Sequence, residues 1–290
     1  MKVISINNLN GGVGKTHTAT NLAQGLARKG KKILLVDADP QASTTDNVLE
    51  FGNEFTENEI SLFREKISKG MTEFKALEEV ISGESAIYDL SDVLEEPEIV
   101  KQAIYHTKRE NLDIIPSSMR LDEADKNISD DRTRSSITRM YEAFQYIENC
   151  YDFIVIDGAP RLDLITTNSL LVSDLVIIPI KMDRKSIKGL LRTLKSMVLI
   201  QKRNHIDFDF KFLLQMVNRN RNDKKMIEFY KEYFKDSIFN QTIRFQAKPI
   251  SDADLHNQYV IDNKKSNIAQ DYLKFIDEVY EYFRKEENKL

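Results

Sequence analysis

The chain alternates short apolar runs with longer stretches of helical periodicity, and this alternation restricts the fold more than any other feature. Each run has the length of a buried strand. Strands joined by helices are connected by right-handed crossovers, which produce a mostly parallel twisted sheet covered by helices on both faces. We therefore predict an α/β fold whose ligands bind at the carboxyl ends of the strands. The apolar runs are VISI (3–6), ILLV (33–36), DII (113–115), FIVI (153–156), LVII (175–178) and FLLQMV (212–217).

One long segment interrupts the alternation. Residues 50–110 are helical in pattern, acidic and nearly free of short apolar runs. We interpret them as an insertion between the second and third strands. The sequence shows no internal repeat, low-complexity segment or linker, and 290 residues suit one large α/β domain. The simplest prediction is a single domain over 1–290 with a helical acidic insertion at about 50–110.

Composition excludes several classes of protein. No apolar run approaches the roughly 20 residues of a membrane span, and the N-terminal MKVISIN does not have the pattern of a signal peptide. Cys150 is the only cysteine, which excludes an internal disulfide and a cysteine-rich metal site. The four histidines lie far apart, without metal-ligand spacing. We expect a cytoplasmic protein.

The segment NNLNGGVGKTHTAT (7–20) follows the first predicted strand and opens a predicted helix. Glycines let backbone N–H groups converge on anionic oxygens, and a helix N-terminus adds favourable partial charge. Lys15 can reach the β- and γ-phosphates of a nucleotide, and the Thr16 hydroxyl can ligate Mg²⁺. The usual pattern G-x-x-x-x-G-K-[ST], however, requires a glycine where this chain has Leu9. The context predicts a phosphate loop of unusual form.

Two aspartates support the same site. Asp37 ends the run ILLV within DADPQAST, and Asp157 ends the run FIVI within YDFIVIDGAP. In phosphate-loop enzymes, an aspartate that ends a buried strand beside the loop holds the hydration shell of Mg²⁺. An aspartate at one strand end is common, but the loop and both aspartates together predict a nucleotide site.

These motifs resemble those of the deviant Walker A family, and within it the ParA-type partition ATPases. Their loop reads K-G-G-x-G-K-[ST], which needs no glycine at the position of Leu9. The resemblance implies the deviant Walker A phosphate-loop NTPase fold. Because the chain starts almost directly at its first strand, we expect the short form that lacks an N-terminal DNA-binding domain. Four further stretches resemble family motifs: LLVDADPQAST, YDFIVIDGAPRLDLITTNSLLVSDLVIIPI, IFNQTIRFQAKPISDAD (238–254) and DNKKSNIAQDYLKFIDEV.

The resemblance implies ATP and Mg²⁺ as cofactors and suggests a role for each site residue. Lys15 and Asp37 are the expected catalytic residues: Lys15 neutralises phosphate charge, and Asp37 positions or activates the attacking water. Thr16 is expected to ligate Mg²⁺, with Asp157 and Asp37 acting through water. Asn218 is expected near adenine, with Arg219 as a further candidate. The expected nucleotide-binding residues are Gly11, Gly12, Val13, Gly14, Lys15, Thr16, His17, Asn218 and Arg219.

One position departs from the family pattern. The signature lysine, which in the family reaches across an ATP-sandwiched dimer to the other subunit's phosphates, falls on Asn10. Three interpretations stay open: another cation such as Arg161 or Arg184 substitutes, hydrolysis is slow while nucleotide-driven dimerisation survives, or the residue is a mutation of this chain. Losing a cation that stabilises phosphoryl transfer should reduce turnover more than binding. His17 stands where a threonine is usual.

Charge is unevenly distributed along the chain. Residues 46–110 hold 16 acidic and 7 basic side chains, whereas residues 181–225 hold 13 basic and 4 acidic ones. Residues 184–203 predict an amphipathic helix whose cations share one face. Its predicted apolar stripe is Ile187, Leu190, Leu191, Leu194 and Val198. The expected DNA-binding residues are Arg184, Lys188, Arg192, Lys195, Lys202, Arg203, Arg219, Arg221, Lys224 and Lys225.

Few aromatic residues accompany these cations, which favours phosphate contacts over base stacking. In the partition family, such regions bind DNA without sequence preference. The resemblance therefore implies an ATP-dependent DNA segregation switch: a homodimer that forms on ATP binding, nonspecific binding of double-stranded DNA on the nucleoid, and release on hydrolysis stimulated by a ParB-like centromere-binding protein.

Alternative functions come from the same superfamily. A membrane-surface positioning ATPase resembling MinD needs a basic amphipathic C-terminal tail, whereas residues 271–287 carry 6 acids and 3 bases. We therefore expect no membrane partner. A hydrolysis-impaired, nucleotide-dependent regulator is the alternative that Asn10 suggests. A metabolic enzyme is a further class, although one cysteine excludes the nitrogenase iron protein's cluster, which takes two cysteines from each subunit.

Overall fold

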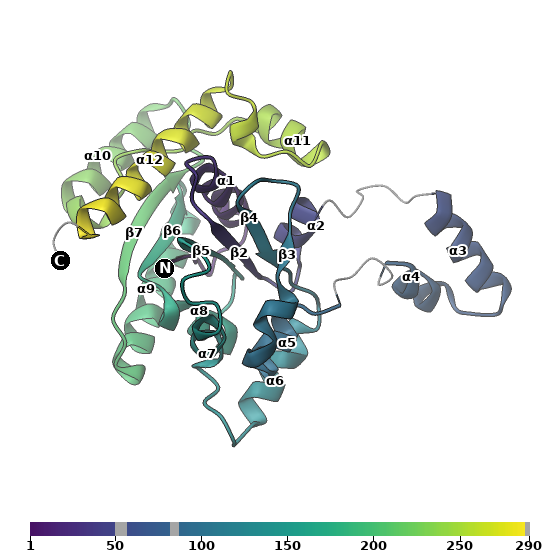
Figure 1. The fold of residues 1–290 in the computed structure, drawn as a ribbon. Helices are drawn as coiled ribbons and strands as arrows, with labels where there is room; N and C mark the ends of the chain where they lie inside the picture. The colour runs from purple at the N-terminus through teal and green to yellow at the C-terminus, as the bar shows by residue number, and fades with distance from the viewer. Residues whose placement is uncertain (50–56, 82–86, 288–290) are drawn as a thin grey trace.

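A seven-stranded sheet forms the centre of the molecule (Figure 1). The computed structural model describes residues 1–49, 57–81 and 87–287, apart from a few side chains that include those of Arg184 and Lys185. The strand order is β3-β4-β2-β5-β1-β6-β7. Every neighbouring pair is parallel except β3 and β4. The strands are β1 (Lys2–Ile6), β2 (Ile33–Ala38), β3 (Tyr105–His106), β4 (Leu112–Ile115), β5 (Phe153–Gly158), β6 (Leu175–Lys181) and β7 (Asp209–Gln215).

The six predicted strands and the predicted fold class are confirmed. Strand β3 was not predicted, because two residues are too short to show a period. Helices connect the strands. They are α1 (Lys15–Ala27), α2 (Ser43–Leu49), α3 (Glu57–Ser68), α4 (Glu73–Ile81), α5 (Leu90–Glu95), α6 (Leu121–Asp130), α7 (Arg139–Gln145), α8 (Leu164–Val172), α9 (Arg184–Asn204), α10 (Arg221–Tyr233), α11 (Ala247–Leu255) and α12 (Asn267–Glu287), with short 3₁₀ helices at Pro97–Ala103, Lys235–Ser237 and Val260–Asp262.

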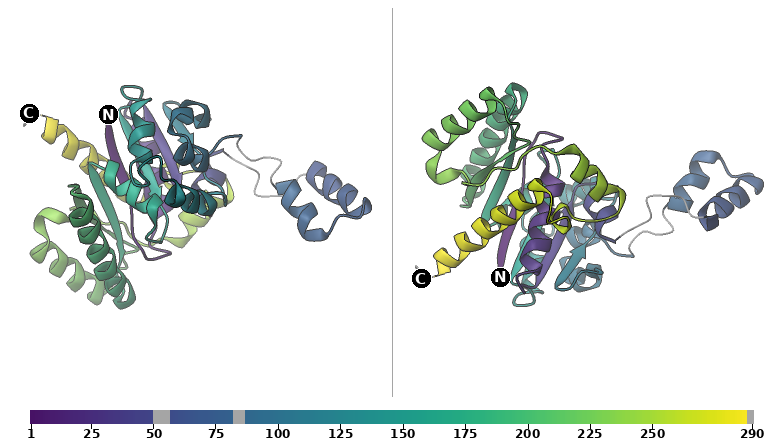
Figure 2. Two further views of the ribbon diagram at one scale, coloured as in Figure 1. Left: turned by 90° about the horizontal axis from the view of Figure 1, so that it is seen from below. Right: turned by 90° about the horizontal axis from the view of Figure 1, so that it is seen from above.

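Helices cover both faces of the sheet because successive strand residues point to opposite faces. Ile4 and Ile6 of β1 pack in one core with α1 and α12. Val3, which precedes Ile4 and points to the other face, packs in the opposite core with α5, α7 and α8. A third cluster joins β6 and β7 to α9 and α10. Figure 2 shows α12 crossing one face of the sheet beside α1. No helix among the described residues is long and apolar enough to cross a lipid bilayer.

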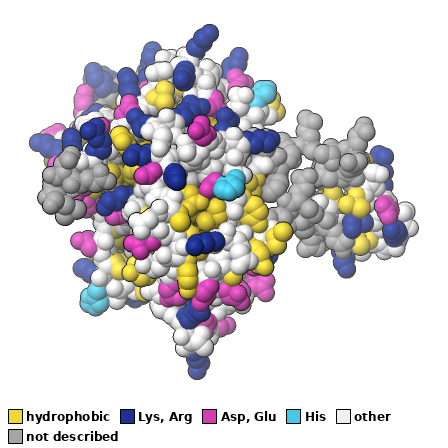
Figure 3. Space-filling model, viewed as in Figure 1, with side chains coloured by type: hydrophobic (Ala, Val, Ile, Leu, Met, Phe, Trp, Pro, Cys, Tyr) yellow, Lys and Arg dark blue, Asp and Glu magenta, His cyan; other side chains and the backbone are white. Residues whose placement is uncertain are grey.

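The segment predicted as an insertion, 50–110, divides into two structural parts. Helices α3 and α4 pack against each other as a hairpin that projects from the body (Figures 1 and 2). The hairpin exposes Phe74, and Figure 3 shows apolar, basic and acidic side chains together on its visible face. By contrast, Leu90, Val93 and Leu94 of α5 are fully buried against the sheet. The body of the fold therefore includes α5 and the 3₁₀ helix after it, while residues 50–56 and 82–86 lie outside the described residues.

Candidate functional site

The loop between β1 and α1 has the backbone conformation that its glycines permit. Gly12 and Gly14 have φ angles of 67° and 85°, in the left-handed region that favours glycine. A Cβ atom at Gly14 would lie 2.6 Å from Oε1 of Gln215, whereas a Cβ at Gly11 would meet nothing within 4 Å. The loop is therefore tightly packed against β7 at Gly14 and open on its outer side. Helix α1 begins at Lys15, with no acidic residue in its first turn, as an anion site requires.

Lys15 lies at the floor of this loop. Its side chain is buried, and its Nζ donates to the backbone oxygen of Asn10 at 3.3 Å. Burial lowers the pKa of Lys15, and the carboxylates of Asp157 and Asp39 oppose this shift. A carbonyl oxygen is a weak partner for an ammonium group, and a phosphate would be a stronger one.

Asp157 is held by two hydroxyl groups. Thr16 and Thr44 donate to its Oδ2 at 2.8 and 2.7 Å. Its Oδ1 is buried and has no hydrogen-bond partner among the described residues. Burial raises the pKa of Asp157 to about 6, although the Thr44 and Thr16 hydrogen bonds oppose the shift. One oxygen of Asp157 is thus fixed beside Thr16, and the other is left to accept a hydrogen bond from a metal-bound water.

The environment of Asp37 does not suit a residue that activates water, because both of its carboxylate oxygens already accept hydrogen bonds within the chain. It is fully buried, and its Oδ2 accepts hydrogen bonds from the backbone N–H and the hydroxyl of Thr45, both at 2.8 Å. Its Oδ1 accepts from the N–H of Asp39 at 3.1 Å. Burial raises the pKa of Asp37 to about 8, and the nearby Asp157 adds to the shift. The visible role of Asp37 is to hold the turn 39–45.

Asp39 is the residue that sequence reasoning missed. It is half-buried, and its charge acts on both Lys15 and Asp157. Its Oδ1 accepts only from the N–H of Gln41, at 3.0 Å, among the described hydrogen bonds. Asp39 is therefore better placed than Asp37 to meet a water next to the phosphates. The sequence signal that could have identified Asp39 is the second aspartate of the motif DADP.

The residues of this site fit a magnesium-bound triphosphate. The open side of the loop at Gly11, the Thr16 hydroxyl and the unpartnered Oδ1 of Asp157 supply amide donors, one metal ligand and one acceptor for metal-bound water. Among the described residues, no group of three or more His, Cys, Asp or Glu side chains could hold a metal ion. A metal here would therefore depend on phosphate oxygens, as Mg²⁺ in nucleotide sites commonly does.

The end of β7 lies beside the same loop. Gln215 donates to the backbone oxygen of Gly14 at 3.4 Å and to the Thr18 hydroxyl, and it accepts from Tyr272. Asn218 and Arg219 follow β7 and are exposed, so they lie on the loop's edge of the sheet. The N–H of Asn218 donates to Asp223 at 2.7 Å. A contact of Asn218 or Arg219 with adenine stays a prediction.

The candidates for a substitute cation are differently placed. Arg161 forms ion pairs with Asp122 and Asp163 of its own chain. The side chain of Arg184 lies outside the described residues. His17, in the first turn of α1, has its Nε2 3.8 Å from an oxygen of Asp254. Within the described residues, Arg161 is therefore already neutralised by acids.

Helices α9 and α10 lie side by side (Figure 2) and carry the predicted DNA-binding cations, except Arg219, which lies just before α10. Asp183 and Asn220 begin these helices, each accepting a backbone N–H at 2.8 Å. Nine of the ten cations have described side chains. All nine are exposed, and none forms an ion pair with a described residue. We call them the α9–α10 surface: Lys188, Arg192, Lys195, Lys202, Arg203, Arg219, Arg221, Lys224 and Lys225.

The predicted apolar stripe of α9 is partly wrong. Leu191 and Val198 are 56% and 45% exposed, whereas Leu190, Met197 and Ile200 are buried. The buried face of α9 also contains small and polar residues. A prediction from hydrophobic periodicity alone does not identify them. The exposed face of α9 therefore mixes cations with three apolar side chains, those of Leu191, Val198 and Leu199.

Comparisons with known proteins identify the family of the chain. The family model for the AAA domain matches residues 1–210. The sporulation initiation inhibitor protein Soj of Bacillus subtilis is 31% identical over 96% of this chain and 98% of its own length. The chromosome partitioning protein ParA of Caulobacter vibrioides is 24% identical, covering 96% of this chain and 94% of its own.

Among solved structures, a plasmid partition protein from Borrelia burgdorferi B31 bound to AMPPNP superimposes with a TM-score of 0.68. It is 27% identical in sequence, and the match covers 98% of this chain and 99% of that one. The match in sequence therefore extends beyond the loop and includes the C-terminal half of the chain. The protein belongs to the AAA-domain family of P-loop ATPases that includes Soj and the ParA partition proteins.

Proposed function

We propose that this protein is an ATP-dependent DNA segregation switch. ATP and Mg²⁺ bind at the loop before α1 and drive formation of a homodimer. The dimer binds double-stranded DNA through phosphate contacts, without sequence preference, and associates with the nucleoid in the cytoplasm. A ParB-like centromere-binding partner stimulates hydrolysis, and the dimer then releases DNA.

One observation carries this proposal: a cluster of cations that form no ion pair with any described residue lies on a helix that contacts the phosphate loop. The backbone N–H of Leu9, within the loop, donates to the hydroxyl of Thr193 in α9 at 3.2 Å. Lys188, Arg192 and Lys195 of the same helix are exposed. Exposed cations without acidic partners are suited to the phosphates of a nucleic acid. A nucleotide site and a candidate DNA surface therefore share one structural element.

The proposed site chemistry uses this chain's own residues as the geometry arranges them. Lys15 would move from the Asn10 carbonyl to phosphate oxygens, and the loop amides would bind the same anion. Thr16 and Asp157 would hold the Mg²⁺ ion, which neutralises phosphate charge when bound. Asp39 would orient the attacking water, while Asp37 holds the turn that positions Asp39.

We expect basal turnover to be slow. Asn10 is neutral, and Arg161 is engaged by two acids of its own chain. A cation that stabilises the transferring phosphoryl group is worth roughly 10³–10⁵ in rate in related phosphate-loop enzymes. Without such a cation, binding and dimerisation would persist better than hydrolysis.

One observation favours the membrane-surface alternative. Leu191 and Val198 are exposed among the cations of α9, as in helices that lie on anionic lipid. The C-terminal helix, in contrast, is not free to bind a membrane through its apolar face. Phe275, Ile276 and Val279 of α12 are buried in the core.

DNA binding measured by fluorescence anisotropy tests the proposal. A random-sequence duplex is titrated with protein in AMPPNP and Mg²⁺, in ADP and Mg²⁺, and without nucleotide, at several salt concentrations between about 50 and 200 mM. We expect the AMPPNP state to bind at least about fivefold more tightly than the ADP state, with an affinity that falls steeply with salt. Equal dissociation constants in all three states would refute the switch.

Two further measurements complete this experiment. Light scattering should report a dimer mass only in the AMPPNP sample. Sedimentation with anionic phosphatidylserine vesicles serves as the competing arm. Nucleotide-dependent vesicle binding without DNA binding would support the membrane-surface alternative and contradict the segregation switch.

A further inference from the structure

The side chain of Asn10 packs against helix α9 of its own chain. Its Nδ2 donates to the backbone oxygen of Ser186, in the first turn of α9, at 3.2 Å. Its backbone N–H donates to Oδ1 of Asn8 at 2.9 Å, which fixes the loop backbone at this point. At the position of the family's signature lysine, this chain therefore has a residue bonded within its own subunit.

Gly189 makes this close approach possible. It is a buried glycine inside α9, and a Cβ atom there would lie 1.9 Å from Oδ1 of Asn10. Glycine inside a helix lowers helix stability, so its presence needs a packing reason. Asn10 occupies the space that a larger residue at 189 would need.

A second contact joins the loop to the same helix one turn further on. The Thr193 hydroxyl, which is buried, accepts from the N–H of Leu9 and donates to Oδ1 of Asn8, both at 3.2 Å. Asn8 in turn donates to the backbone oxygen of Pro179 in β6 at 2.7 Å. Positions 189 and 193 are four residues apart and so lie on one face of α9. The loop contacts this face, while the helix exposes Lys188, Arg192 and Lys195 elsewhere.

Asn10 also contacts the residue that would meet the nucleotide. Its backbone oxygen accepts from Nζ of Lys15 at 3.3 Å. When Lys15 turns to a phosphate, this hydrogen bond is lost, and the backbone around Asn10 loses one of its restraints. The phosphate site is therefore connected to α9 by two hydrogen bonds, from Lys15 to Asn10 and from Asn10 to Ser186.

We propose that Asn10 is a positioning residue that couples the phosphate loop to the DNA-binding surface by its contact with Ser186 and Gly189. This inference rests on the proposed function. In this chain, position 10 links nucleotide state to DNA affinity within one subunit. The contact needs glycine at position 189, because a Cβ atom there would overlap the Asn10 side chain.

The test compares DNA affinity in AMPPNP with that in ADP for four variants. Asn10→Ala removes the whole contact, and Asn10→Asp keeps its shape but places an acceptor against the Ser186 carbonyl. Gly189→Ala introduces the methyl group that overlaps Asn10, and the double variant Asn10→Ala/Gly189→Ala relieves the overlap. Asn263→Ala, at an exposed asparagine outside the α9–α10 surface, is the matched control.

We expect Asn10→Ala and Asn10→Asp to lower the AMPPNP-to-ADP affinity ratio about fivefold or more, while Mg²⁺·AMPPNP binding changes much less. Gly189→Ala should lower the melting temperature, and the double variant should recover it without recovering the ratio. A purely structural role would instead restore both. The control should match the wild type.

Two outcomes would overturn the inference, and they are distinguishable. If the wild type discriminates between the nucleotides and Asn10→Ala retains the full ratio, the coupling role of Asn10 is wrong while the switch stands. If the wild type itself shows a ratio of one, the proposed switch and the coupling fail together.

Discussion

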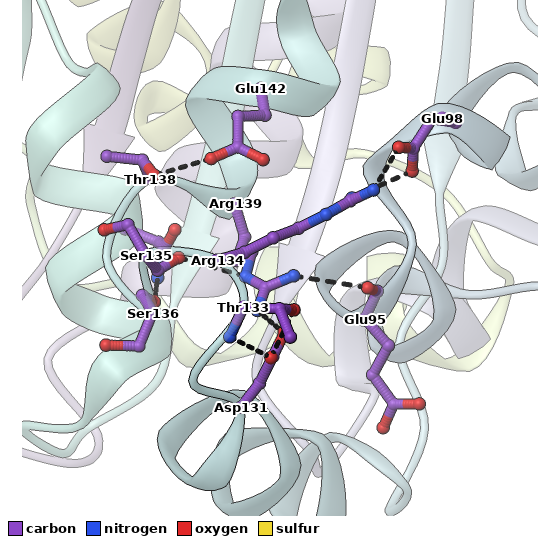
Figure 4. A network of polar contacts seen from close by, with 11 residues as sticks. Glu95, Glu98, Asp131, Thr133, Arg134, Ser135, Ser136, Thr138, Arg139 and Glu142 are labelled. Atoms are coloured by element: carbon purple, nitrogen blue, oxygen red, sulfur yellow. Dashed lines mark hydrogen bonds and ion pairs between the residues drawn. The ribbon is translucent and has the colours of Figure 1, made fainter.

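The connection between α6 and α7 and the α9–α10 surface both contain arginine, but they use its charge in opposite ways. In the first region, Arg139 is fully buried and donates to the backbone oxygens of Ser135 and Glu95 at 3.0 and 3.3 Å (Figure 4). It also pairs with Asp131, and Arg134 pairs with Glu98. In the second region, nine cations are exposed and none forms an ion pair with a described residue.

The difference between the paired arginines of the first region and the exposed cations of the second indicates two different roles for charged side chains in this molecule. A buried guanidinium whose donors are satisfied fixes the geometry of the segment around it, and removing it leaves its acidic partner uncompensated. Clustered exposed cations repel one another, and a partner that supplies negative charge would relieve this repulsion. The α6–α7 connection is therefore structural, and the α9–α10 surface is a candidate for binding.

Replacing Arg139 tests the structural half of this contrast and has the largest expected effect. We expect Arg139→Ala to lower the free energy of unfolding by about 2–4 kcal/mol, because two backbone carbonyls lose their donor and the buried side chain leaves a cavity. Urea unfolding followed by circular dichroism measures the loss. Lys195→Ala on the α9–α10 surface should leave stability nearly unchanged, and equal losses in the two variants would remove the contrast.

Removing cations from the α9–α10 surface tests the binding half. The triple variant Lys188→Gln, Arg192→Gln and Lys195→Gln should weaken DNA binding in AMPPNP and reduce the slope of log affinity against log salt by about 2.7, because about 0.9 counterions are released per phosphate contact. Anisotropy titrations at several salt concentrations measure the slope.

The matched control for this variant removes the same charge elsewhere. Lys101→Gln, Lys108→Gln and Lys126→Gln change three exposed lysines outside the α9–α10 surface. If net charge alone governed DNA binding, the slope of log affinity against log salt would fall by the same amount in both triple variants. A loss restricted to the first variant identifies the surface.

Adding a cation to the phosphate loop sharpens the contrast further. We expect Asn10→Lys to raise ATP turnover by at least about tenfold, since a cation that stabilises phosphoryl transfer is worth far more in related enzymes. Phosphate release by the purified protein with ATP and Mg²⁺ measures the gain. Unchanged turnover would show that another cation already serves the site.

A third kind of charge, buried and without a full cationic partner, gives an effect on stability that is small over any single pH unit. Burial raises the pKa of Asp37 to about 8 and that of Asp157 to about 6, above their ordinary value near 3.8. At a pH between the ordinary value and the raised value of each aspartate, the folded protein binds more protons than the unfolded chain. The free energy of unfolding should therefore fall as pH rises from about 4 to about 8.

Thermal or urea unfolding of the nucleotide-free protein across this pH range measures the trend. Each proton involved contributes at most about 1.4 kcal/mol per pH unit. Asp37→Asn should flatten the slope, whereas Asp236→Asn, at an exposed aspartate, should keep it. A wild-type stability that rises over the range would contradict the raised pKa values.

The sheet and the phosphate loop could be predicted from the sequence because their signals are local. Buried parallel strands read as continuous apolar runs, and each of the six predicted runs overlaps a strand, although β7 ends at Gln215 and its run extends to Val217. The same reasoning predicted helix at α5 but missed that this helix belongs to the core, since it buries Leu90, Val93 and Leu94 within only six residues among acids. One turn and a half of helix is too short to establish a period.

The details of the site depended on contacts between distant residues. Whether Asp37 or Asp39 is left for a ligand is decided by Thr45, whose N–H and hydroxyl occupy Asp37. The environment of Asn10 is decided by Gly189, far along the chain. Sequence periodicity carries no information about such pairs, and only the packed fold brings them together.

The contact between Asn10 and Gly189 also constrains the evolution of this protein. As long as position 10 is asparagine and packs on α9, mutation of Gly189 to any other residue should be selected against. In lineages where lysine stands at position 10, glycine at the matching helix position should be free to drift. Substitutions at these two sites should therefore be correlated among homologues.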